Sequence, residues 1–135
     1  MTSPPLTRAD VTAGVGAAIA AYTQALDDGR TEDVVATFCP DGSCDMPGLG
    51  RHTGHDALRG AYAPLKPTMP QRHLVFNLLL TAWDEQEARA TSDVALLLRD
   101  ESGWTVRLVG RYHDVLHRDD GDQWRFHSRH AEFTA

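Results

Sequence analysis

Hydrophobic residues in the first part of the chain recur at helical spacing. Between residues 10 and 28 the apolar side chains return every three or four positions, which places them on one face of a helix. They are Val11, Val15, Ile19, Tyr22 and Leu26. Gly29 suits the end of this helix. Thr31 is then predicted to cap a second short helix over residues 32–38, with acidic residues in its first turn.

The middle of the chain predicts one short strand and a third helix. The stretch "GSCDMP", residues 42–47, favours a short strand that "PGLG" closes. The stretch "GHDALRGAYAPL", residues 54–65, again carries its apolar residues at helical spacing. Pro67 and Pro70 end this helix because proline cannot continue one.

From residue 72 onward hydrophobic residues recur at every second position instead of at helical spacing. Four strands are predicted, over residues 72–83, 86–99, 104–118 and 123–133, with "DEQ", "DESG" and "DDGD" as hairpin turns between them. Long strands joined by tight turns form a curved antiparallel sheet. Helices followed by such a meander predict an α+β fold, in which three helices and a concave sheet enclose a cone with an apolar pocket.

Composition limits the classes of function. The chain has 135 residues, of which 41% are hydrophobic and 24% are charged. This is the size and composition of one soluble domain, here residues 10–135 after a flexible tail over residues 1–9. The net charge of −6 argues against binding nucleic acid or an anionic membrane surface. The first residues carry neither a basic start nor a long apolar stretch, so we expect a cytoplasmic protein.

Cysteine and lysine usage narrows the chemistry further. Cys39 and Cys44 are five residues apart across a turn-like "PDGS", and free thiols are expected there rather than a disulfide. Lys66 is the single lysine and stands between prolines in an exposed segment. A Schiff-base mechanism needs a desolvated lysine, so that chemistry is excluded.

The strand at 72–83 mixes polar groups into an apolar run. By strict alternation His73, Val75, Asn77, Leu79 and Thr81 share one face, while Leu74, Phe76, Leu78 and Leu80 share the other. An apolar wall with a few polar groups is typical of a small-molecule site. His73 and Asn77 would lie about 13 Å apart and could contact different parts of one ligand. The alternative is that His73 only forms a hydrogen bond at the rim of the sheet.

The strand at 104–118 offers two possible polar faces. Val109, Arg111, His113 and Val115 share one face, and Gly110, Tyr112, Asp114 and Leu116 share the other. Arg111 is a candidate partner for a carboxylate or oxyanion, with an exposed surface position as the alternative. A bulge that shifts the register by one residue would turn Tyr112 and Asp114 inward instead.

The order of elements and several segments resemble a known family. The segments are "ALDDGRTEDVVATFCPDGSCDMPGLG", "TGHDALRGAY", "RHLVFN", "GRYHDVLHR" and "DQWRFHSR", which together span nearly all of residues 10–133. They resemble the superfamily of nuclear transport factor two, ketosteroid isomerase and scytalone dehydratase, and most of all its SnoaL-like branch. This fold hosts lyases, isomerases, hydrolases, cyclases and binding proteins, so the site must decide the function.

The resemblance implies a catalytic pair. A histidine at the place of His73 is the general acid/base of the dehydratase, and an aspartate near the end of the first helix hydrogen-bonds to it. Asp27 matches that aspartate; Asp28, about 100° further round the helix, is the alternative partner. An imidazole takes and returns a proton near neutral pH, and a carboxylate behind it fixes its tautomer and stabilises the imidazolium.

The same resemblance suggests which residues bind the substrate. It also shows positions where this chain differs from the dehydratase. His113 matches a substrate-binding asparagine of the dehydratase. The dehydratase's first-helix tyrosine corresponds to Leu26 here, and its second catalytic histidine falls near Leu98. Tyr22 and Tyr62 are candidates to replace the lost hydroxyl, or else are ordinary core aromatics.

The histidine spacings do not predict a functional metal, and no cofactor motif is present. His113 and His117 are four apart on a strand, about 13 Å from each other. His127 and His130 would face opposite sides of their strand. His52 and His55 flank a turn and, with Cys44, could form only a fortuitous site.

The sequence therefore predicts a cofactor-independent lyase or isomerase of the dehydratase type. Its substrate would be a small, largely apolar, oxygenated molecule such as a polyketide or aromatic intermediate. The alternatives are a polyketide cyclase, an epoxide hydrolase, or a non-catalytic ligand-binding or accessory subunit. A homodimer formed through the sheet is expected from the family, with a trimer as the alternative.

Overall fold

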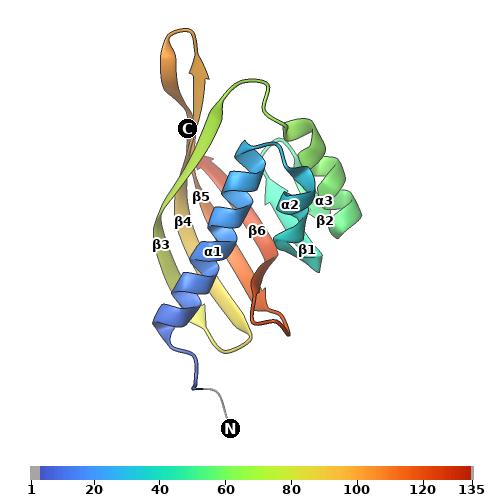
Figure 1. The fold of residues 1–135 in the computed structure, drawn as a ribbon, viewed down its shortest axis with the longest axis vertical. Helices are drawn as coiled ribbons and strands as arrows, with labels where there is room; N and C mark the ends of the chain where they lie inside the picture. The colour runs from blue at the N-terminus through green and yellow to red at the C-terminus, as the bar shows by residue number, and fades with distance from the viewer. Residues whose placement is uncertain (1–3, 135) are drawn as a thin grey trace.

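The computed structural model describes residues 4–134, and it confirms the predicted α+β fold. The helices lie against the concave face of one strongly curved sheet, with α1 crossing that face and α2 and α3 beside it (Figure 1). The elements are α1 Arg8–Asp27, α2 Thr31–Ala36, β1 Phe38–Met46, β2 Gly50–Thr53, α3 His55–Tyr62, the 3₁₀ turn η1 Ala63–Leu65, β3 Gln71–Trp83, β4 Glu87–Asp100, β5 Gly103–Arg118 and β6 Trp124–Thr134.

The first helix begins earlier than the sequence predicted. Thr7 is the N-cap: its hydroxyl accepts from the backbone N–H of Asp10, whose carboxylate accepts from the N–H of Thr7. Arg8 and Ala9, expected in the tail, are therefore helical, and residues 1–3 of that tail lie outside the described part of the chain. The expected cap at Thr31 is wrong, because Arg30 is the N-cap of α2 and no side chain caps it.

The four long strands match their predicted ranges to within about one residue at each end, but the sheet contains more than the meander. Its strand order is β2-β1-β6-β5-β4-β3. β2 was not predicted and pairs antiparallel with β1. β1 pairs with β6 in parallel, so the sheet is mostly, not wholly, antiparallel. The concave sheet remains open, and helix α1 covers its middle.

The core lies between the helices and the concave face. Val11 and Val15 of α1 are fully buried, and Tyr22 of the same helix contacts aromatic rings from several elements. Its ring centroid is 6.1 Å from that of Phe38 and 5.7 Å from that of Phe126. The apolar helix faces thus meet the sheet as their spacing predicted. Among residues 4–134, no helix combines the length and apolar character needed to cross a membrane.

A β-bulge in β3 changes which side chains face the helices. Phe76 pairs with Asp93, but Leu79 pairs with Thr91, so β3 contains one extra residue between them. Asn77 lies in this bulge with a φ of 56°. This is a left-handed conformation that asparagine tolerates better than most residues. Beyond the bulge the inward positions are no longer those of strict alternation.

Candidate active site

The predicted pair of Asp27 and His73 is in direct contact. Nδ1 of His73 lies 2.6 Å from Oδ1 of Asp27, and the backbone N–H of His73 donates to Oδ2 at 2.8 Å. Both side chains are largely buried, at 13% exposure for His73 and 5% for Asp27. Because Nδ1 carries the proton toward the carboxylate, the neutral ring keeps a lone pair on Nε2.

The end of α1 and the start of β3 together position this pair. Asp27 is the last residue of α1, and the chain turns away at Gly29, which has a φ of 71°. Glycine adopts this left-handed conformation without strain. Gln71, which precedes His73 on the same face of β3, donates from Nε2 to Oδ1 of Asp27 at 3.1 Å. The carboxylate thus accepts three hydrogen bonds, which fix its plane behind the imidazole ring. Asp28, the alternative partner, is exposed and pairs with Arg30.

An apolar cavity of about 260 Å³ lies next to the pair, between the helices and the concave face of the sheet. We call it the inner cavity. Every long strand and α1 contribute to its wall, so a bound molecule would be enclosed on many sides. Its polar lining residues are Tyr22, Gln71, His73 and Tyr112. Its apolar lining residues are Leu26, Met46, Pro47, Leu49, Leu65, Val94, Leu96, Leu108 and Phe133. A mostly apolar wall with a few polar groups fits a small organic molecule.

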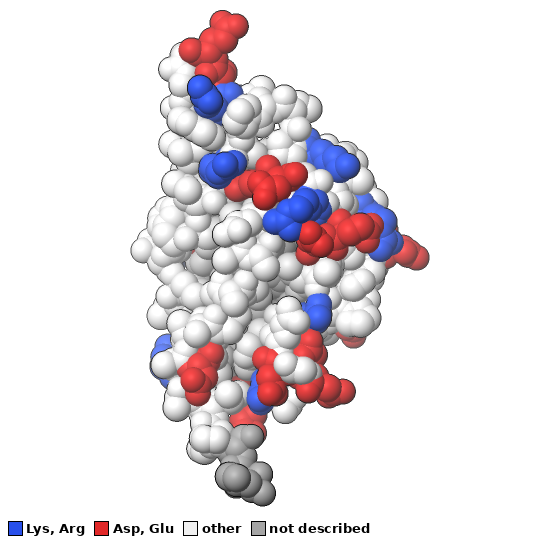
Figure 2. Space-filling view, viewed as in Figure 1, with Lys and Arg blue, Asp and Glu red and all other residues white. Residues whose placement is uncertain are grey.

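A second hollow, the outer groove, runs between α1 and β3 on the other side of His73. It has a volume of about 580 Å³ and is lined from Gly16 to Asp28 on the helix and from Arg72 to Leu78 on the strand. The molecular surface over the middle of α1 and β3 carries no charged side chains, whereas both ends of this face do (Figure 2). His73 lines both hollows, but only the inner cavity draws its wall from all the long strands.

The hydroxyl groups of Tyr22 and Tyr62 form a buried pair. Their oxygen atoms are 2.7 Å apart. Burial raises the pKa of both phenols far above the ordinary value, so both remain neutral hydrogen-bond donors. Tyr22 lines the inner cavity, whereas Tyr62 lies behind it and contacts Tyr22.

Beneath the tyrosines lies a fully buried ion pair that the sequence did not single out. Nε of Arg129 lies 3.1 Å from Oδ1 of Asp114, and neither side chain is exposed. The guanidinium carbon is 3.5 Å from the ring centroid of Tyr112 and 4.3 Å from that of Tyr22. These are cation–π distances, so the aromatic rings replace part of the solvation that Arg129 loses. Burial raises the pKa of Asp114 to about 6, against the opposing effect of Arg129.

Three of the predicted substrate-binding residues lie elsewhere. Asn77 donates to Asp93 at 2.8 Å, and Arg111 donates to the same carboxylate at 2.8 Å. His113 pairs with Glu132. None of the three lines the inner cavity or the outer groove. The inward placement expected for Asn77 and His113 is therefore wrong, and for Arg111 the alternative of an exposed surface position holds.

The physical reason lies in the register of each strand. The bulge turns Asn77 outward and brings Leu78 and Leu80 toward the helices, where Leu80 is buried. On β5 the alternative register holds, because Tyr112 and Asp114 are the buried, inward pair. Among the groups that the prediction missed, Gln71 was visible as an inward neighbour of His73, since the two alternate on one face.

A comparison with known protein families identifies the family of this chain. A family described as SnoaL-like domain matches residues 7–130, which is nearly the whole chain. The chain belongs to the SnoaL-like domain family. No curated protein matches this SnoaL-like domain closely enough to be informative.

Solved structures resemble this SnoaL-like domain over most of its length. A Catenulispora acidiphila protein in complex with S-DNPA is 26% identical with a TM-score of 0.83, covering 93% of this chain and 95% of that one. Rv3472 of Mycobacterium tuberculosis, of unknown function, is 26% identical with a TM-score of 0.82, covering 90% and 70%. "Putative Scytalone Dehydratase" from Novosphingobium aromaticivorans is 23% identical with a TM-score of 0.80, covering 93% and 85%, which shows a shared fold.

Three side chains of types that bind metals lie close together in this SnoaL-like domain, away from the pair of Asp27 and His73. Within the described residues, one group of three such side chains converges, formed by Cys39, His117 and His127. None of them lines the inner cavity. His52 and His55 each place Nε2 against a backbone carbonyl, and both cysteines are free thiols, as expected.

Proposed function

We propose that this protein is a cofactor-independent lyase or isomerase that moves a proton on a small, largely apolar, oxygenated molecule. The contact between Asp27 and His73 at the wall of the inner cavity carries this proposal. The substrate class suggested by the family resemblance is a polyketide or aromatic intermediate. Membership of the SnoaL-like family and the fold shared with a scytalone dehydratase relative support a scaffold of this type.

The proposed reaction uses His73 as a reversible proton carrier. Nε2 of His73 takes a proton from the carbon next to a carbonyl group, and the electron pair of that C–H bond moves onto the carbonyl oxygen. Asp27 stabilises the imidazolium through Nδ1–H. If the proton then goes to a departing β-hydroxyl group, the products are an enone and water. If the substrate carries a β,γ C=C bond, the intermediate is a dienolate; return of the proton to its γ-carbon gives the conjugated isomer.

The enolate oxygen needs a hydrogen-bond donor in the cavity. We assign this role to the hydroxyl of Tyr22, because Tyr22 lines the inner cavity and Tyr62 holds its hydroxyl at 2.7 Å. The buried charge of Arg129, 4.3 Å from the Tyr22 ring, favours negative charge on this side of the cavity. Arg129 thereby acts through the tyrosines rather than on the substrate.

The contact between Asp27 and His73 favours the enzymatic alternatives over an accessory subunit. An accessory subunit would have no need of an oriented imidazole, and its cavity would be filled by side chains. A cyclase would use the same acid/base pair to close a carbon–carbon bond. An epoxide hydrolase needs a water held by several polar groups, whereas the polar groups of the inner cavity are few.

Solvent deuterium exchange tests this function without a known natural substrate. Enolisable aromatic ketones and β-hydroxy ketones would be incubated with the protein in D₂O, and deuterium at the α-carbon followed by NMR, with conjugated products followed by ultraviolet absorbance. His73→Gln and Asp27→Asn should slow exchange by about 10²–10⁴-fold. Asp28→Asn makes the same carboxylate-to-amide change one residue away and should exchange like the wild type. Equal exchange by wild type and His73→Gln would refute the mechanism.

The expected homodimer remains a prediction. The outer face of the sheet exposes large apolar side chains that a partner copy would cover. They are Leu74, Phe76, Leu79, Trp104, Val106 and Val109. Isolated apolar residues are common on surfaces, but a cluster on one sheet face is typical of an interface.

A further inference from the structure

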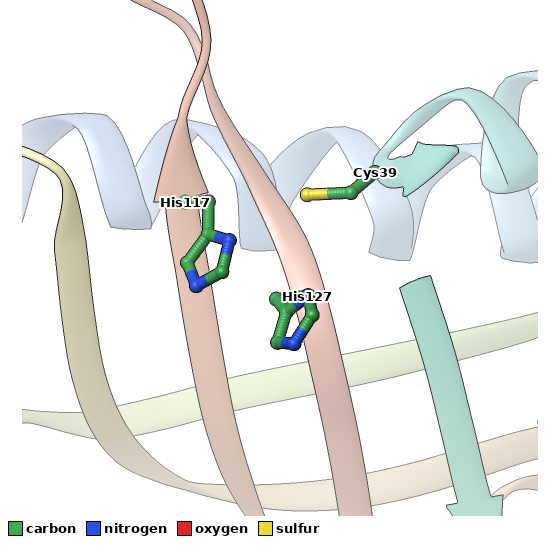
Figure 3. Close-up of side chains that lie close together, drawn as sticks. All are labelled: Cys39, His117 and His127. Atoms are coloured by element: carbon green, nitrogen blue, oxygen red, sulfur yellow. The ribbon is translucent and has the colours of Figure 1, made fainter. Parts of the chain in front are cut away.

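A second cluster of chemically reactive side chains lies on strands β1, β5 and β6, away from the inner cavity. The side chains of Cys39, His117 and His127 reach toward one space from these strands (Figure 3). One ligand atom from each lies within 4.8 Å of the ligand atoms of the other two. We propose that these three residues bind a thiophilic transition-metal ion of the Zn²⁺ class.

The distances suit such an ion once the two imidazole rings rotate out of their stacked arrangement. Tetrahedral zinc with Zn–S near 2.3 Å and Zn–N near 2.0–2.1 Å holds its ligand atoms about 3.3–3.6 Å apart. Both histidine side chains are partly exposed, at 38% for His117 and 40% for His127, so each can rotate by the remaining distance. A thiolate with two imidazoles is a ligand set that zinc uses in proteins, and three ligands leave one coordination position open.

Two irregularities of the sheet bring the ligands together. Val115 pairs with Ser128, whereas Leu116 pairs with Phe126, so His127 is the extra residue of a bulge on β6. The ring of His127 consequently stacks on that of His117, with centroids 4.2 Å apart and planes 12° apart. In strict alternation, neighbouring strands would not present two imidazoles side by side at this point.

The third ligand comes from a second irregularity, in β1. Its pairing with β6 jumps from Phe38 to Ser43, so the segment that contains Cys39 arches over the bulge. A Cβ added to Gly42 would lie 2.7 Å from the carbonyl oxygen of Phe126, which shows how closely the arch approaches β6. Only glycine permits that approach at residue 42.

The hydrogen bonds of the two histidines leave one ring nitrogen of each available, whereas the thiol of Cys39 donates to the carbonyl oxygen of Arg125 at 3.7 Å and would lose that proton on binding an ion. Nε2 of His117 lies 3.0 Å from Oε2 of Glu87, so Nδ1 is left to face the cluster. A carboxylate that holds the far nitrogen of a histidine ligand is the usual support in metal sites. Nδ1 of His127 is buried and has no hydrogen-bond partner among the described residues. A bound ion would satisfy this nitrogen.

The local charge also suits a cation. The carboxylate of Asp41 lies 4.0 Å from Nδ1 of His127 and is a candidate for the open coordination position. The two nearby arginines are already paired, Arg118 with Asp122 at 2.6 Å and Arg125 with Asp119 at 2.9 Å. Burial raises the pKa of the Cys39 thiol, and a coordinated ion offsets this effect because it binds the thiolate.

An approach path for the ion exists. A hollow of about 400 Å³ borders the cluster, and Cys39 and His117 both line it. None of its lining residues lines the inner cavity or the outer groove. The proposed metal site and the proposed proton-transfer site are therefore separate, and each can fail without the other.

The experiment uses the full chain without a polyhistidine tag, stripped of metal by a chelator. Zn²⁺ binding is measured by calorimetry, and Co²⁺ binding by the thiolate-to-metal charge-transfer band in the near ultraviolet. The wild type should bind one equivalent of either ion. Cys39→Ser should remove the charge-transfer band, and His127→Ala should weaken Zn²⁺ binding by more than about 100-fold, since each removes a ligand.

Matched controls keep the result specific to this cluster. His130→Ala removes a histidine further along β6, outside the cluster, and should bind Zn²⁺ like the wild type. Zn²⁺ should raise the Tm of the wild type and of His130→Ala but not that of His127→Ala. Circular dichroism of the metal-free variants checks that each is folded, and Glu87→Gln, which keeps all three ligands, should weaken binding by about 10–100-fold.

Three results would overturn the proposal. They are no Zn²⁺ binding by the folded wild type, wild-type affinity in both His127→Ala and Cys39→Ser, or an equal loss of affinity in His130→Ala. Each would identify the cluster as a buried thiol beside a stacked pair of surface histidines.

Discussion

Asp27 holds His73 by its ring and by its backbone at the same time. One carboxylate oxygen accepts from Nδ1 at 2.6 Å, and the other accepts from the main-chain N–H at 2.8 Å. The contact therefore fixes both the position of the strand residue and the plane of its imidazole. A ring held in this way needs little reorganisation when it takes up a proton, which is what an acid/base catalyst requires.

The tyrosine pair should show coupled effects on stability. Tyr22→Phe and Tyr62→Phe each leave one buried hydroxyl without its partner, and each should lower the free energy of unfolding by about 1–3 kcal/mol. The double variant should lose less than the sum of the two, because no unpaired hydroxyl remains. Urea unfolding of the four proteins measures this cycle, and additive losses would contradict the pairing.

The same variants should differ in catalysis. Tyr22→Phe removes the proposed donor to the enolate oxygen and should lower kcat by about 10²–10³-fold. Tyr62→Phe should lower kcat less, since Tyr62 acts only by holding Tyr22. Steady-state kinetics on a substrate found by deuterium exchange measures both. A larger loss in Tyr62→Phe than in Tyr22→Phe would exclude the assignment.

Asp114 should make the stability depend on pH in an unusual direction. Burial raises its pKa from 3.8 to about 6 in the folded state. The folded protein therefore binds more protons than the unfolded chain between these values. Its contribution to stability is thus fully present below about pH 4 and is lost as the pH rises through about 6. Asp114→Asn removes this dependence.

Comparison of the two proteins isolates the effect from that of other carboxylates. The free energy of unfolding of the wild type minus that of Asp114→Asn should fall between about pH 4 and about pH 7. Urea unfolding at each pH measures this difference. A difference that rises with pH over that interval would show that the attraction of Arg129 outweighs burial at this carboxyl group.

The bulge at Asn77 should tolerate only residues that accept a positive φ. Asn77→Val places a β-branched side chain at a φ of 56°. This change should lower the free energy of unfolding by about 1–3 kcal/mol. Asn77→Gly loses the same hydrogen bond to Asp93 without this strain and serves as the control. Thermal or urea unfolding compares the two. Equal losses would attribute the effect to the hydrogen bond alone.

The outer face of the sheet should form a dimer interface. Phe76→Lys places a charge among exposed apolar side chains and should shift the protein from dimer toward monomer in analytical ultracentrifugation. Asp120→Lys, in the turn between β5 and β6, adds positive charge away from this face and should leave the dimer intact. A wild-type protein that sediments as a monomer at tens of micromolar would refute the expectation.

The sequence alone determined the type and order of most elements and the contact between Asp27 and His73. Hydrophobic periods of 3.6 and 2 reflect which face each segment buries, so they located α1, α3 and the four long strands. The pair of Asp27 and His73 was predicted from the family resemblance, which places an aspartate near the end of the first helix and a histidine at the start of a strand. Both are local features that the sequence retains.

Only the tertiary structure decided which side chains contact each other across neighbouring strands. One extra residue in a bulge turns every later side chain of the strand to the opposite face of the sheet. The local sequence pattern at Asn77 does not indicate this bulge. The partners in pairs such as Asp114 with Arg129, or His117 with His127, are set by register and by the parallel contact of β1 with β6. Alternation along one strand says which side a residue faces, but its neighbours across the sheet depend on how the whole chain folds.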